Sequence, residues 1–309
     1  MSGFIIGDDY IDHDVAYLLG MIVARGTIID TRDLHKVIIQ FPYQNLHVDE
    51  DEQGLDIPTS IELGLSRIQT RIVDLLGCQY RQTDTKTSID LTLTFPSRTI
   101  AWRDIVLHLE GKSDYRSMTV PMVIRDDLVP SDVQMEFIKG YADVAGNVRK
   151  ANRYVDKRNR VRLDVLNENW ELPVQLCRLM QNRLNIPVQT ITWGHPNLGR
   201  GFREHQINIF VAPFQQVGFS FKHKQQMLDK LIEEDKVSEA INEKPYKYAP
   251  CPGRRKKRGT KIIHEDEHSE RLPESLKGQH FDAYWEVCKA LGCKIEPSAP
   301  LFDEDVEEI

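Results

Sequence analysis

The chain has 309 residues, of which 40% are hydrophobic, so it can bury more core than one ordinary domain needs. It contains no run of eighteen apolar residues, and its start, MSGFIIGDDY, lacks the basic and apolar regions of a signal peptide. We therefore expect an intracellular, cytoplasmic protein with no membrane partner, and the five cysteines indicate reduced thiols rather than a disulfide framework.

The net charge of −7 disfavours nucleic acid as a partner, but the charge is spread unevenly. The segment 149–162 holds seven basic residues against the single acid Asp156. A local field decides whether a polyanion can dock on one face, so this segment predicts a phosphate-binding stretch. A solvated charged loop is the alternative. The basic residues are Arg149, Lys150, Arg153, Lys157, Arg158, Arg160 and Arg162.

Two similar segments, 120 residues apart, have the composition of packed helices. YLLGMIVARG spans Tyr17 to Gly26 and FIKGYADVAG spans Phe137 to Gly146, so that Gly20 corresponds to Gly140. Glycine removes the side chain that would hold two helix axes apart, and the pair is therefore expected to pack backbone to backbone.

Hydrophobic periodicity predicts the same element order after each of these helices. We expect Asp14 and Ser131 to cap the two helices, since their side chains can accept amide protons of the first turn. In the first half, strands are expected at 34–41 and 89–95, and helices at 59–78 and 100–110. In the second half, strands are expected at 160–165, 188–193 and 206–211, and helices at 132–145, 170–184 and 222–235.

Each expected strand has one apolar and one polar face, so the apolar faces are assigned to the helices. The other faces then form a solvent-exposed sheet surface. Arginine, glutamine and asparagine can pair with base edges, and all of these polar side chains can reach phosphates. An antiparallel sheet with one wet face and no ligand is the alternative. The residues of this surface are Lys36, Gln40, Thr92, Thr94, Arg160, Arg162, Gln206 and Asn208.

The paired motifs, the strand pattern after each and the ending GFSFKHKQQML at 218–228 resemble the LAGLIDADG family of homing endonucleases. The resemblance implies an α+β fold with two αββαββα halves, residues 1–125 and 126–236, followed by an appendage at 237–309. It implies a monomer whose motif helices meet at an internal pseudo-dyad. It also implies that antiparallel sheets form a saddle over duplex DNA.

The resemblance breaks at the positions where nucleases of this family hold their metal. The acid before the final glycine of each motif is replaced by Arg25 and Ala145. Mg²⁺ needs anionic oxygen ligands, and neither residue supplies one. Asp143 and Asp14 are the nearby acids, but Asp143 lies about 200° round the helix from the metal position and is better explained by a structural hydrogen bond.

These observations predict a DNA-binding protein that acts in recognition or regulation and not in cleavage. Arg25 would then hold the duplex at the centre of the surface, while the basic segment holds its backbone. Three alternatives remain open: an active restriction, defence or homing-type nuclease that uses Mg²⁺ with relocated acidic or histidine residues, a protein-interaction subunit of a nucleic-acid complex, and RNA in place of DNA. Nucleoid association is expected.

The appendage at 237–309 carries a basic run and a set of cysteines and histidines. The run Arg254, Arg255, Lys256, Lys257 and Arg258 could neutralise phosphates, pair with the acidic stretch that follows, or serve as a nuclear address. A second set has ligand types that suit tetrahedral zinc, although the spacing matches no standard finger and packing is the alternative for Cys288. The set is Cys251, His264, His268, Cys288 and Cys293.

Overall fold

A computed structural model describes residues 11–48, 56–96, 99–150, 159–166, 171–186, 188–196 and 203–242. These residues fall into two compact units, one built from 1–147 and 216–226 and the other from 148–215 and 227–309. The predicted appendage from residue 243 onward lies outside the described residues, as do Arg153, Lys157 and Arg158. No helix in the described part is long and apolar enough to cross a membrane.

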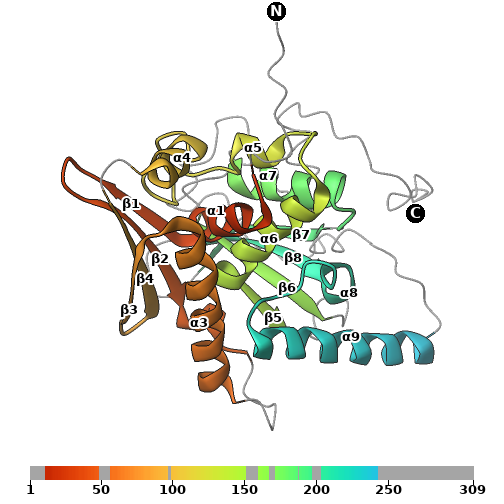
Figure 1. Cartoon of the computed structure of the whole chain (residues 1–309). Coiled ribbons are helices and arrows are strands. Elements are labelled where there is room, and N and C mark those ends of the chain that lie inside the picture. Colours follow the sequence, from red (N-terminus) through yellow and green to blue (C-terminus); the bar gives the residue numbers. More distant parts are fainter. Residues whose placement is uncertain are drawn as a thin grey trace, which may run out of the picture. The chain divides into compact units, whose positions relative to one another are not determined.

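The first repeat runs helix, two strands, helix, two strands, helix (Figure 1). The four strands form an antiparallel sheet in the order β1-β2-β4-β3. The predicted elements are confirmed to within two residues, whereas β1 and β3 were not predicted. The elements are α1 (His13–Arg25), β1 (Gly26–Asp30), β2 (His35–Pro42), α2 (Tyr43–Leu46), α3 (Ile57–Leu76), β3 (Gln79–Asp84), β4 (Ser88–Phe95), α4 (Ile100–His108) and α5 (Met122–Arg125).

The core of this sheet follows the predicted alternation. Val37, Ile39 and Phe41 of β2 are fully buried and lie opposite Leu93, Leu91 and Ile89 of β4. Helix α3 turns a buried stripe of Ile61, Leu65, Ile68 and Ile72 inward. The free-energy gain of burying these apolar side chains fixes which face of each strand points away from solvent.

The second repeat has the same order, and its sheet runs β5-β6-β8-β7. The two repeats together confirm the predicted α+β class with two αββαββα halves. The predicted helix at 170–184 is confirmed, and its last part, Leu179–Arg183, is π-helical. The elements are α6 (Ser131–Ala145), β5 (Gly146–Arg149), β6 (Arg160–Leu166), α7 (Glu171–Arg178), η1 (Leu179–Arg183), β7 (Val188–Pro196), β8 (Arg203–Phe210), α8 (Val211–Phe214) and α9 (Lys222–Asn242).

Helices α1 and α6 pack against each other within the first unit, as the paired glycines predict (Figure 1). The contact is reciprocal, since a Cβ on Gly20 would collide with the carbonyl oxygen of Phe137 and a Cβ on Gly140 with that of Tyr17. Only glycine permits this approach at both positions. Because α6 packs on α1, the first compact unit extends to Asn147, whereas the first repeat is expected to end at residue 125.

Both predicted helix caps are wrong. The N-cap of α1 is Asp12, whose carboxylate accepts the Val15 N–H at 2.8 Å. Asp14 lies in the first turn instead. The N-cap of α6 is Pro130, which makes no side-chain cap bond, and Ser131 is already helical. Cys78 and Cys177 are buried thiols, as expected of core residues.

Candidate nucleic-acid interface

The last turns of α1 and α6 carry the two positions at which the family resemblance places a metal. Arg25 is only 4% exposed, and its guanidinium lies 5.5 Å from the centroid of the Tyr115 ring and donates to the Ala24 carbonyl at 3.2 Å. The expectation that Arg25 holds the duplex at the centre of the surface is therefore corrected, because its guanidinium packs beside the Tyr115 ring and is buried. Ala145 is fully buried, and its carbonyl accepts a hydrogen bond from the Asn45 side chain at 3.1 Å.

Asp143, the nearest acid on α6, is fully buried and makes structural hydrogen bonds, as predicted. Its carboxylate accepts the Tyr17 hydroxyl at 2.7 Å and the Ser220 N–H at 3.0 Å, and so joins α6 to α1 and to the chain before α9. Burial raises the pKa of the Asp143 carboxyl above its usual range, and the charge of Lys224 opposes that shift. Burial also raises the pKa of the Tyr17 phenol well above its usual value.

Lys224 places a cation at the end of α6 that sequence patterns did not predict. Its Nζ donates to the carbonyl oxygens of Asp143 and Gly146, both at 2.9 Å, and it is fully buried. A cation is favoured at a helix C-terminus because the carbonyls there lack helical partners. Burial lowers the pKa of Lys224 to about 8, although the charge of Asp143 acts in the opposite direction.

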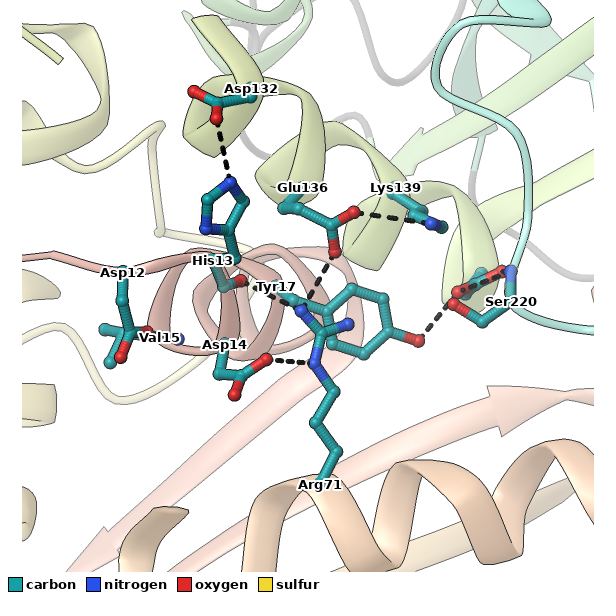
Figure 2. A network of polar contacts seen from close by, with 11 residues as sticks. Asp12, His13, Asp14, Val15, Tyr17, Arg71, Asp132, Glu136, Lys139 and Ser220 are labelled. Atoms are coloured by element: carbon teal, nitrogen blue, oxygen red, sulfur yellow. Dashed lines mark hydrogen bonds and ion pairs between the residues drawn. The ribbon is translucent and has the colours of Figure 1, made fainter. Parts of the chain in front are cut away.

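The opposite ends of the two helices are joined by a partly exposed polar network around Arg71 of α3 (Figure 2). The guanidinium pairs with Asp14 of α1, donates to Glu136 of α6 at 3.0 Å and lies 4.3 Å from the centroid of the Tyr17 ring. Asp14 therefore serves in a structural ion pair. Lys139 extends the network by pairing with Glu136 at 3.3 Å.

His223, next to Lys224, holds the start of α9 to the first repeat. Its Nε2–H donates to the Leu46 carbonyl at 2.6 Å, which leaves Nδ1 to accept from the Ser60 hydroxyl at 2.9 Å. The same hydroxyl accepts the His223 backbone N–H at 3.0 Å. Burial lowers the pKa of His223 from its usual 6.5 to about 4, because the charged imidazole would lose solvation.

The polar face of the first sheet is half exposed and carries the predicted residues in register. Lys36 lies opposite Thr94, and Gln40 lies opposite Asp90. One cation of this face was missed: Arg81 on β3 is exposed and lies opposite Thr92. β3 lacks a buried apolar face, so its sequence gives no alternation from which the strand could be predicted.

The polar face of the second sheet has a different charge balance. Arg162 lies opposite Asn208, as expected for two polar side chains on one face. Two residues on, Asp164 lies opposite Gln206 and is fully buried. Arg162 Nε is 2.9 Å from the Asp164 carboxylate, so part of the predicted positive charge is neutralised within the sheet. Arg160 is half-buried, while Arg149 and Lys150 are exposed.

The predicted zinc ligands and the basic run both belong to the appendage. Cys251, His264, His268, Cys288, Cys293 and the basic run at 254–258 lie outside the described residues. Within the described residues, no group of three or more histidine, cysteine, aspartate or glutamate side chains could hold a metal ion. The zinc site therefore stays a prediction about the appendage.

Neither a family model nor a curated protein matches the chain. Solved structures do match it. Full-length WhiA from Thermatoga maritima is 12% identical with a TM-score of 0.43, and the match covers 74% of this chain and 64% of that one. The homing endonuclease I-DmoI in complex with DNA and manganese is 19% identical with a TM-score of 0.38, over 69% of this chain and 96% of that one. The homing endonuclease I-WcaI bound to its DNA recognition sequence is 9% identical with a TM-score of 0.40, over 66% and 80%.

The chain therefore spans about two thirds of the length of the WhiA protein. At these identities and scores the matches add no argument about activity. The fold assignment follows from the chain's own topology: two αββαββα repeats with the same strand order, and motif helices that pack through reciprocal glycines. This is a LAGLIDADG-like fold.

Proposed function

We propose that this protein binds duplex DNA through the polar faces of its two sheets and that it recognises or regulates DNA without cutting it. The observation that carries the proposal is the chemistry at the ends of the motif helices. Neither position offers a carboxylate: one holds Arg25 and the other Ala145. Metal-assisted phosphodiester cleavage at these positions would need oxygen anions to hold the cation.

The nearby acids support the absence of metal chemistry because each already has a structural partner. Asp143 is fully buried between Tyr17 and Ser220, and Asp14 is paired with Arg71. The end of α6 already holds a cation, since the Lys224 ammonium contacts its carbonyl oxygens. A divalent ion would have to displace that ammonium and break the hydrogen bonds of Asp143.

The sheet faces support the binding part of the proposal. On the first sheet Lys36 and Gln40 are half-buried and Arg81 is exposed. On the second sheet Arg160, Arg162 and Asn208 are half-buried, and all six residues lie on the polar side of their strands. Arginine and lysine supply phosphate contacts, and glutamine and asparagine can read adenine edges. Exposed Arg149 and Lys150 would add backbone contacts at the end of β5.

Fluorescence anisotropy with a mixed-sequence duplex tests the binding claim. The logarithm of the association constant should fall linearly with the logarithm of salt, with a slope of about −0.9 for each phosphate contacted. Arg81→Ala should reduce that slope. Arg67→Ala, on the exposed side of α3, removes the same charge away from the sheet and should leave the slope unchanged. A salt-independent affinity of the unaltered protein would contradict the proposal, and tighter binding to an RNA duplex would reassign the ligand.

A further inference from the structure

A short segment after α4 extends the first sheet past its β1 edge. The Ile28 N–H donates to the Ser113 carbonyl at 2.7 Å, and the Tyr115 N–H donates to the Gly26 carbonyl at 3.0 Å. Thr27 and Asp114 form the antiparallel bridge between these two bonds. The segment is therefore fixed to the sheet beside the end of α1.

The chain then turns sharply, and the turn fixes the backbone of Arg116. The Asp114 carboxylate accepts the Arg116 N–H at 2.9 Å. The Asp114 carbonyl accepts both the N–H and the hydroxyl of Ser117, at 2.9 and 2.8 Å. An aspartate side chain that accepts the backbone N–H two residues further along stabilises a turn, so the backbone of Arg116 leaves the sheet in a defined direction.

The Tyr115 ring lies close to two guanidinium groups. Arg116 lies 5.4 Å from the ring centroid and Arg25 lies 5.5 Å from it. Arg25 is buried, whereas Arg116 is exposed and makes no ion pair with any residue that the structure describes. Stacking on an aromatic face restricts the arginine side chain, so less entropy is lost when its planar donor fork binds an anion.

We infer that Arg116, held by the Tyr115 ring, contacts a phosphate of the bound duplex. This contact rests on the proposed function and deepens it, because it adds a phosphate contact beside the β1 edge of the first sheet. A phosphate suits this group because a guanidinium can donate two parallel hydrogen bonds to two of its oxygens. The nearby Arg25 charge adds a favourable field for an anion.

The test compares Arg116→Ala with Arg103→Ala in the full chain, by anisotropy with a mixed-sequence duplex. Both arginines are exposed and both changes remove one positive charge, but Arg103 lies on α4 beside Asp104. Arg116→Ala should make the salt slope shallower by about 0.9. The affinity ratio of unaltered protein to variant should then fall about three- to fourfold between roughly 50 and 200 mM salt. Arg103→Ala should leave the slope unchanged.

Two further variants separate the tyrosine's role from the charge itself. Tyr115→Phe keeps an aromatic face and should bind as the unaltered protein does, whereas Tyr115→Leu removes the face and should weaken binding. Arg116→Lys restores the charge and should recover most of the slope. Circular dichroism of each variant checks that the fold is kept.

The outcomes distinguish the inference from the proposed function. If the unaltered protein binds with a salt-dependent affinity but Arg116→Ala behaves like Arg103→Ala, the phosphate assignment is wrong and the function stands. If the unaltered protein does not bind the duplex, both are overturned. Inorganic phosphate is titrated in parallel by thermal shift. Phosphate stabilisation that Arg116→Ala abolishes, with duplex binding unchanged, would assign the site to a free anion instead and overturn the nucleic-acid contact.

Discussion

Replacing Asp143 with alanine should lower the stability of the fold, because this carboxylate has a structural role and not a catalytic one. The substitution removes the acceptor of the Tyr17 hydroxyl and of the Ser220 N–H, and it leaves the buried Lys224 ammonium without its nearby carboxylate. Leaving a buried donor without its acceptor costs about 1–3 kcal/mol, so the loss of the acceptor for both the Tyr17 hydroxyl and the Ser220 N–H should cost about 3–5 kcal/mol in total. For a unit of this size each kcal/mol corresponds to about 2–4 °C in Tm, so the expected decrease is about 6–20 °C.

Thermal unfolding followed by circular dichroism measures this decrease, with Asp33→Ala as the control. Asp33 is exposed in the turn between β1 and β2, and its loss should change Tm little. Tyr17→Phe and the double variant complete a cycle, whose coupling energy should be about 0.5–3 kcal/mol because the two side chains share a hydrogen bond. An Asp143→Ala protein that keeps its Tm but loses a Mg²⁺-dependent cleavage activity would refute the structural role.

Three further predictions concern the same unit. His223 should destabilise the fold as pH falls, because its folded pKa of about 4 lies below the usual 6.5. The stability present above pH 6.5 is then lost progressively toward pH 4. His223→Gln should flatten this part of the plot of unfolding free energy, measured with urea, against pH. The free energy of unfolding should also depend on Lys224 at alkaline pH, because its folded pKa of about 8 lies below the usual 10.5. Between these two values the stability of the unaltered protein relative to Lys224→Met should rise by up to about 1.4 kcal/mol per pH unit. A difference that does not change with pH would contradict the burial of the ammonium. Gly140→Ala should separate α1 from α6 and cost about 1–3 kcal/mol despite the better helix propensity of alanine, whereas a stabilised variant in thermal unfolding would contradict the close approach.

Much of the fold could be predicted because burial imposes a period on the sequence. The alternation of Val37, Ile39 and Phe41 specifies a half-buried strand, and the matched glycines at 20 and 140 specify a close helix pair. β3 was not predicted from the sequence because it lies at the edge of the sheet and has no buried apolar face. Edge strands lack the pattern on which such predictions depend.

The polar centre could be predicted only in part, because its partners are far apart in sequence. The helical angle between Asp143 and position 145 correctly predicted that the Asp143 side chain points away from the metal position. No local pattern indicates that Lys224 contacts the end of α6 or that Arg71 pairs with Asp14. The same limit explains the error at Arg25, whose burial depends on Tyr115, 90 residues further along the chain.

If the protein holds duplex DNA without cutting it, one reaction should show both the binding and the intact strands. A labelled duplex is titrated with the full chain in Mg²⁺ and, separately, in Mn²⁺. Anisotropy reports binding, and a denaturing gel of the same samples reports strand integrity. We expect salt-dependent binding with every strand intact in both metals. Strand scission that depends on metal and that disappears in a folded Asp143→Asn protein would contradict it.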